Sequence, residues 1–270
     1  MTIYLSAHSS IVLQIHLLNA GGTCIVRIAY DWIGGNIYYT DRSAHRVGFC
    51  NLVRQFCTVI LSKEDGVVGD PIAIALHPKI GRVFWGNQNL GGSASIYSAN
   101  MDGSSPVKVA GTGISYPTGI AIDLENSRIY WTDLRGNKIE SCTMDGEERY
   151  VVAILAGSPG PAGIDIMGDY LYWGEITANR IWSMTQTFGC QTTGPALLYD
   201  EGERIHDLKV YDGSKQPLDR ENPCICSGCS HLCALSGEEG VRCLCPAGIE
   251  LGADGKTCHS NCTLAAVVEK

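Results

Sequence analysis

The stretch Ile129-Tyr130-Trp131-Thr132-Asp133 decides the fold, because looser copies of it recur along the chain at a nearly fixed interval. The copies are Ile37-Tyr38-Tyr39-Thr40-Asp41, Val83-Phe84-Trp85-Gly86-Asn87, Leu171-Tyr172-Trp173-Gly174-Glu175 and, in worn form, Ile3-Tyr4-Leu5-Ser6. Successive first aromatic residues stand 34, 46, 46 and 42 positions apart. A repeat of about this length indicates an array of similar supersecondary units.

Each repeat has the same internal pattern. An apolar run such as Gly119–Asp123 precedes the aromatic strand, and Lys138–Thr143, an Asp145-Gly146 turn and Tyr150–Ile154 follow it. Asp-Gly between strand-forming residues predicts a hairpin, and four short antiparallel strands make one propeller blade. We therefore predict an all-β propeller.

The motif residues have a structural reason to recur. Large aromatic side chains bury the area that holds one blade against the next, and the polar residues can satisfy backbone donors in a neighbouring turn. We expect these packing and capping roles at Tyr38, Asp41, Phe84, Trp85, Tyr130, Trp131, Thr132, Asp133, Tyr172 and Trp173.

Composition excludes several classes of function. The 270 residues are 45% hydrophobic and 18% charged, with a formal net charge of −8, which argues against a nucleic-acid partner. No apolar run reaches the length of a membrane span. Neither a zinc-binding HExxH pattern nor a Ser-His-Asp arrangement stands out, so we expect no enzyme, no cofactor and no metal.

Cysteine usage separates a second domain from the propeller. Of the 13 cysteines, seven lie between Cys224 and Cys258, which is typical of a disulfide framework from an oxidising compartment. We divide the chain into a propeller at 1–218, a disulfide-rich domain at 219–262 and a tail at 263–270. Because no convincing signal peptide precedes this extracellular type of sequence, we expect a fragment of a longer protein.

Together, the aromatic repeats and the Cys229-Ser230-His231-Leu232-Cys233 segment resemble the YWTD β-propeller and epidermal-growth-factor-like module of the low-density-lipoprotein-receptor family. This family includes the lipoprotein receptor-related proteins and Wnt co-receptors. The family propeller has six blades, whereas about five are present here. The run from His206 to Tyr211 resembles the strand that closes the ring. Near Arg27 the usual loop between an outer strand at 24–26 and an inner strand at 28–31 is missing.

The resemblance implies the pairing of the cysteines. The bridges would be Cys224–Cys233, Cys229–Cys243 and Cys245–Cys258, with Cys226 as an alternative first partner. Cys50 and Cys57 flank a hairpin turn and either pair across the strands or remain free thiols. The states of Cys24, Cys142, Cys190, Cys226 and Cys262 stay open, and Asn261 is a candidate glycosylation site.

The resemblance also implies where a ligand binds. Partners of such propellers dock on an end face formed partly by the loops entering each inner strand. Thr118 stands where related propellers carry an asparagine that recognises an Asn-containing peptide, so recognition of that peptide is not expected. His77, which follows an inner strand, and His206, near this face, are candidate acid switches. The implied ligand-contact residues are Ile72, Tyr116, Thr118, Arg204 and His206.

We therefore predict a non-catalytic extracellular module of an endocytic or signalling receptor that binds a secreted or matrix protein. The parent protein would be anchored in the membrane at the cell surface. One alternative is a nidogen-like matrix protein. Another is a calcium-dependent propeller hydrolase, because Asp31, Asp123 and Asp165 end inner strands; their recurrence once per blade favours a structural role instead.

Overall fold

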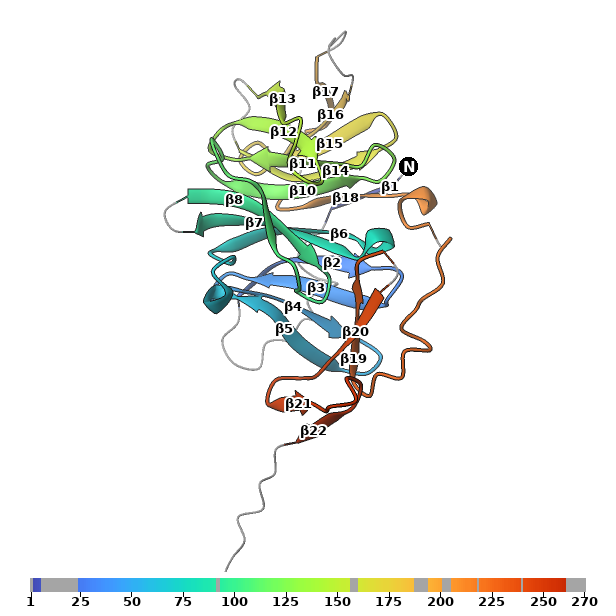
Figure 1. Ribbon diagram of the computed structural model, residues 1–270. Helices are drawn as coiled ribbons and strands as arrows, with labels where there is room; N and C mark the ends of the chain where they lie inside the picture. The colour runs from blue at the N-terminus through green and yellow to red at the C-terminus, as the bar shows by residue number, and fades with distance from the viewer. Residues whose placement is uncertain are drawn as a thin grey trace, which may run out of the picture.

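The computed structural model describes residues 2–5, 24–90, 93–155, 160–186, 194–200, 205–217, 219–238 and 240–260. Four antiparallel sheets of four strands follow one another along the chain, and their inner strands β2, β6, β10 and β14 lie side by side. This arrangement, visible as stacked sheets in Figure 1, confirms the predicted all-β propeller.

We number the four sheets as blades 1 to 4. Blade 1 contains β2 (Ile25–Asp31), β3 (Asn36–Asp41), β4 (Arg46–Asn51) and β5 (Phe56–Ser62). Blade 2 contains β6 (Pro71–His77), β7 (Arg82–Leu90), β8 (Ser93–Asn100) and β9 (Val107–Ala110). Blade 3 contains β10 (Pro117–Asp123), β11 (Arg128–Asp133), β12 (Lys138–Thr143) and β13 (Tyr150–Ile154). Blade 4 contains β14 (Pro161–Met167), β15 (Tyr170–Glu175), β16 (Ile181–Thr185) and β17 (Ala196–Tyr199).

The aromatic motif occupies the second strand of every blade in one register. Trp85, Trp131 and Trp173 each pair with an isoleucine of their own inner strand, and all three are at most 1% exposed. Trp131 packs in the core between blades 2 and 3, whereas Tyr130 packs in the core between blades 3 and 4. One dipeptide thus supplies aromatic area to both neighbouring interfaces, which explains why the chain repeats it.

A fifth sheet is assembled from both ends of the sequence. Strand β1 (Thr2–Leu5) pairs with β18 (Leu208–Tyr211), in blue and orange near the N label of Figure 1. Ile3 lies opposite Val210 as Ile129 lies opposite Ile122, so the worn copy occupies the same register as the clear ones. Strand β18 contacts β14, which places it as the next inner strand of the array.

The N-terminal side of blade 1 differs from our expectation. Residues 24–26 do not form a separate outer strand, because β2 runs without interruption from Ile25 and only shifts its register between Ile25 and Arg27. The Arg27 guanidinium donates to the carbonyl of His206 at 2.5 Å and lies 3.7 Å from the Asp207 carboxylate. Arg27 therefore links blade 1 to the segment that enters β18.

The C-terminal domain is a small disulfide-bonded module. It contains the hairpin of β19 (Leu232–Ser236) and β20 (Gly240–Leu244) and the hairpin of β21 (Ile249–Leu251) and β22 (Cys258–Ser260). Its disulfides are those that the resemblance implies, and a fourth joins two strands of blade 1. The four are Cys224–Cys233, Cys229–Cys243, Cys245–Cys258 and Cys50–Cys57.

Three cysteines of the described residues are free thiols: Cys24, Cys142 and Cys226. Cys226 is exposed, and Cys224 rather than Cys226 takes the first position of the framework. Cys142 is buried, and burial raises the pKa of its thiol to about 12. Cys190, Cys262 and the glycosylation candidate Asn261 lie outside the described residues.

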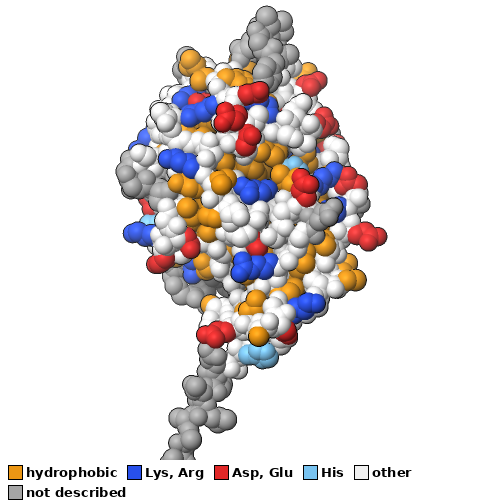
Figure 2. Space-filling model, in the orientation of Figure 1, with side chains coloured by type: hydrophobic (Ala, Val, Ile, Leu, Met, Phe, Trp, Pro, Cys, Tyr) orange, Lys and Arg blue, Asp and Glu red, His pale blue; other side chains and the backbone are white. Residues whose placement is uncertain are grey.

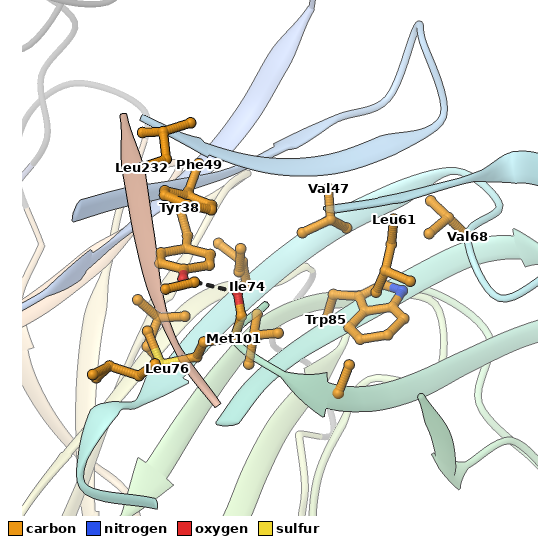
Figure 3. Packing of buried hydrophobic residues seen from close by; sticks show 14 of the residues in the cluster. Tyr38, Val47, Phe49, Leu61, Val68, Ile74, Leu76, Trp85, Met101 and Leu232 are labelled. Carbon is orange, nitrogen blue, oxygen red and sulfur yellow. Dashed lines mark hydrogen bonds between the residues drawn. The ribbon is translucent and has the colours of Figure 1, made fainter. Parts of the chain in front are cut away.

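The module packs against the ends of blades 1 and 2. Leu232 is fully buried beside Phe49 and Tyr38, as Figure 3 shows, and Leu235 belongs to the same cluster. Each buried leucine contributes about 1.5–3 kcal/mol. The Tyr38 hydroxyl donates to the carbonyl of Met101 at 2.8 Å, which ties blade 1 to blade 2 inside this cluster.

Hydrogen bonds to backbone carbonyls of the module complete the interface. Arg54 donates to Cys229 at 2.9 Å, Thr58 to Cys245 at 2.9 Å and Asn36 to Cys233 at 3.0 Å. The propeller and the module therefore form one packed body, which Figure 2 shows in space-filling form.

The described residues also contain three short 3-10 helices, all in connecting segments: η1 (Lys63–Asp65), η2 (Pro78–Ile80) and η3 (Gly213–Lys215).

Candidate ligand-binding face

The loops that enter the inner strands share one end of the blades with the turns between second and third strands. This follows from antiparallel order, because the chain reverses direction at each strand. The module lies at the opposite end, against the turns between first and second strands. The loop-bearing end is therefore the end free of the module, and we call it the loop face.

Acidic residues of the motif hold these loops in place. The Asp133 carboxylate accepts from the backbone N–H of Ser115 at 2.8 Å, of Tyr116 at 2.9 Å and of Gly136 at 3.0 Å. It is fully buried, so these charge-assisted bonds are shielded from solvent. In blade 2, Asn87 plays the same part by accepting from Gly69 at 3.0 Å. The motif thus fixes the loop face as well as the core.

Two of the implied contact residues lie beneath the loop face, which corrects their expected role. Ile72 and Thr118 are 5% and 4% exposed. The Thr118 hydroxyl donates to the carbonyl of Pro161 at 2.8 Å and therefore connects blade 3 to blade 4. A ligand can reach Tyr116, which is half-buried, and His206, which is exposed. Arg204 lies outside the described residues.

Next to Tyr116, on the side of Arg135, lies a feature that the sequence did not indicate. The Arg135 guanidinium lies 5.2 Å from the centroid of the Tyr116 ring, a cation–π contact. Beside it is an open hollow of about 820 Å³, bounded by the segment 111–115, Arg135, Lys108 and Gln88. Arg135 belongs to a turn between second and third strands, whereas our expectation considered only the entry loops.

The acids at the inner strands serve as local caps. Asp31 accepts from the N–H of Gly34 at 2.8 Å, and Asp123 accepts from the N–H of Asn126 at 3.0 Å. Burial raises the pKa of Asp31 to about 6. These two carboxylates stand at the start of a turn between first and second strands, so both are used to close that turn.

Asp165 does not recur at that position, contrary to our expectation. It pairs with Tyr172 as Ala121 pairs with Tyr130, two positions before the end of its strand. Its carboxylate accepts from the N–H of Val210 at 2.8 Å and from the Lys215 ammonium, and so anchors β18. Among the described residues, no group of three His, Cys, Asp or Glu side chains could hold a metal ion.

Burial makes His77 harder to protonate than an exposed histidine. This side chain is 5% exposed, and burial lowers the pKa of its imidazole to about 4. It therefore stays neutral over the pH range of endosomes, where an unperturbed histidine would gain a proton. His206 is exposed on the segment entering β18, and its role stays a prediction.

Comparisons with known proteins show that the chain is similar to parts of receptors. It is 29% identical over 249 residues to the vitellogenin receptor of Solenopsis invicta and 30% identical over 247 residues to the vitellogenin receptor Yl of Drosophila melanogaster. Each match covers 90% of this chain but only 13% and 12% of those receptors. The low-density lipoprotein receptor-related protein 5-like protein of Homo sapiens is 28% identical over 122 residues, 45% of this chain and 46% of that protein.

Two other comparisons say nothing about function: one found no match, and the other shows only a similar fold. No protein-family model matches the chain. The structure of virginiamycin B lyase from Staphylococcus aureus with quinupristin superposes with a TM-score of 0.55 at 19% identity, over 70% of this chain and 60% of the lyase. At that identity the likeness shows the fold alone. No helix in the described ranges is both long and apolar enough to cross a membrane.

Proposed function

The chain carries a YWTD β-propeller of the low-density-lipoprotein-receptor family, and we propose that it serves as a non-catalytic extracellular module that binds a secreted protein on its loop face. The parent protein would be an endocytic or signalling receptor at the cell surface. Because two relatives are vitellogenin receptors, vitellogenin is one candidate ligand. The chain spans about an eighth of the length of those relatives, so the ligand belongs to the proposal.

One observation supports the loop face as the place where the ligand binds. The module covers the opposite end of blades 1 and 2, while buried Asp133 fixes the loop that presents Tyr116. A rigid, solvent-facing loop loses little conformational entropy when a partner docks.

The experiment is to block the loop face with an N-glycan. Gly113 is exposed at φ +71°, and Gly113→Asn completes an Asn-Ile-Ser acceptor with the natural Ile114 and Ser115 without a steric conflict. Asparagine tolerates this left-handed conformation. The matched control, Gly168→Asn with Tyr170→Thr, places a glycan at the other end of blade 4, where Gly168 is likewise exposed at φ +53°.

Binding of the secreted chain to immobilised vitellogenin is then measured for each glycoform. We expect the glycan at position 113 to abolish binding and the glycan at position 168 to leave it within about twofold. Binding that survives the first glycan and is lost with the second would overturn the choice of face. Absence of binding by the unmodified chain would overturn the choice of vitellogenin.

A further inference from the structure

The hollow beside Tyr116 has a charge opposite to that of the whole molecule. Lys108 and Arg135 line it and both are exposed, although the chain has a net charge of −8. In the described part of the chain, neither side chain forms an ion pair with a carboxylate. The positive charge at this point is therefore available to a ligand.

Both cations are held toward the hollow. Arg135 is positioned by the Tyr116 ring, 5.2 Å from its guanidinium carbon. Lys108 lies across Gly111, where a Cβ atom would collide with the lysine side chain and stand 2.7 Å from its Nζ atom. The absence of a side chain at Gly111 thus gives the ammonium room to rest against the loop.

A second pair of cations reinforces the loop from behind. Lys138 donates to the carbonyl of Gly113 at 3.0 Å, and Arg149 donates to the carbonyl of Thr112 at 2.6 Å. Both also contact the nearly buried Glu140, at 3.1 and 2.9 Å. Two loop carbonyls are therefore occupied by internal donors, and one carboxylate offsets only part of the local positive charge.

We propose that this hollow, between Lys108 of blade 2 and Arg135 of blade 3, binds an acidic side chain of the protein ligand. A guanidinium matches a carboxylate with two parallel hydrogen bonds, and a nearby ammonium adds a point charge. The inference rests on the proposed function and deepens it, since it names the chemistry of the segment that the loop face recognises.

The test uses the full chain and a blocked, fluorophore-labelled tetraglutamate peptide, with the tetraglutamine peptide as the uncharged reference. Fluorescence anisotropy measures binding to the natural sequence and to Lys108→Glu and Arg135→Glu. Lys63→Glu and Arg42→Glu are the matched controls. Both residues are exposed at the loop face but outside the hollow, and each substitution changes the net charge by the same amount as those in the hollow.

We expect tetraglutamate to bind, tetraglutamine to bind at least about tenfold more weakly, and either hollow variant to lose about tenfold in affinity. The two control variants should stay within about threefold, and high salt should weaken binding. Lys108→Gln and Arg135→Gln, which add no negative charge, should lose a smaller factor in the same direction. Unfolding temperatures of all variants verify that the changes are local.

Three results would overturn the proposal: no binding of tetraglutamate, equal losses in the hollow and control variants, or tighter binding of a heparin octasaccharide through the same two residues. The first result would show that the hollow does not bind carboxylates. The second would show that the peptide responds to the net charge of the whole protein. The third would show that the hollow binds a sulfated sugar instead. Because the glycan experiment uses a protein ligand and this one a peptide, the two proposals can fail separately.

Discussion

Blades 3 and 4 share the aromatic half of the motif and differ in its polar half. Trp131 and Trp173 are equally buried and hold the same register against their inner strands. The next two residues are Thr132 and Asp133 in blade 3 but Gly174 and Glu175 in blade 4. The aromatic pair is therefore the part that the architecture requires, whereas the polar pair is adapted to what the next blade places beside it.

At the threonine position of the motif, the size of the side chain is matched to its neighbour in the next blade. Thr132 donates to the carbonyl of Ala162 at 2.6 Å on the following inner strand. At Gly174 the same space is filled by Ile205, which a Cβ atom would strike. Blade 2 repeats the exchange, because Pro117 lies 3.1 Å from the point where Gly86 would carry a Cβ atom. A small residue in the motif thus accompanies a large one in the next blade.

The acidic position of the motif differs in its hydrogen bonds. Asp133 accepts three backbone N–H groups, whereas both carboxylate oxygens of Glu175 are buried and have no hydrogen-bond partner among the described residues. Burial raises the pKa of Glu175 accordingly. The same sequence position therefore stabilises one blade and leaves a desolvated acid in the other.

The largest effect is expected where the two blades agree. Trp131→Ala and Trp173→Ala should each lower the free energy of unfolding by about 3–5 kcal/mol, because each removes a fully buried indole. Urea denaturation checks this, with Tyr170→Ala as the control since that side chain is 47% exposed. A difference of several-fold between the two tryptophans would mean that the blades do not share the same core.

Asp133→Ala should be the next most damaging change. It leaves the N–H groups of Ser115, Tyr116 and Gly136 without their acceptor, and we expect a loss of about 2–3 kcal/mol. Amide hydrogen exchange should speed up at Ser115 and Tyr116 first. Glu175→Ala is the counterpart in blade 4, and a loss as large as that of Asp133→Ala would contradict the comparison.

Restoring a side chain in blade 4 should destabilise it. Gly174→Ala forces a methyl group against Ile205 and should cost about 1–3 kcal/mol. The double variant Gly174→Ala with Ile205→Ala should cost less than the sum of the single changes, which a double-mutant cycle measures. Strict additivity would show that Ile205 does not occupy the space of the missing side chain.

The smallest effect is expected from Glu175→Gln, and its sign depends on pH. A carboxyl group whose pKa is raised in the folded state contributes stability below its unfolded pKa and loses it as pH rises through the folded pKa. The amide does not titrate, so the variant should gain on the natural chain from mildly acidic to neutral pH, by about 1 kcal/mol or less. Denaturation midpoints across that range measure the gain, and a variant that loses stability instead would show that the carboxylate is paired.

Most of the fold was predictable because aromatic repeats are local in sequence. The interval of the motif places the second strand of each blade, and the Asp-Gly turns of blades 2 and 3 place their third and fourth strands, without reference to distant residues. The uninterrupted β2 was missed, since Ile25 and Val26 are compatible with either an outer or an inner strand. The position of Asp165 was missed because the turn between β14 and β15 has two residues, whereas the corresponding turn of blade 3 has four, so an equal spacing to the aromatic motif does not give an equal position in the strand.

The candidate site was harder to predict because it is made by neighbours in space. Lys108 belongs to the last strand of one blade and Arg135 to a turn of the next, and only the stacking of blades brings them to one hollow. Ile72 and Thr118 lie at the start of inner strands as expected, but their side chains turn under the loop face. Position along the chain indicates the correct end of a blade; it does not indicate which side chains face outward.

The pairing of β1 with β18 has a consequence for biosynthesis. During translation, blades 1 to 4 can form and stack in the order in which they emerge, because each uses consecutive segments. The fifth sheet cannot, since its second strand is made first and its inner strand only after all four blades. Strand β1 must therefore stay unpaired until β18 has been made, and during that interval it can be bound by a chaperone or pair with another chain.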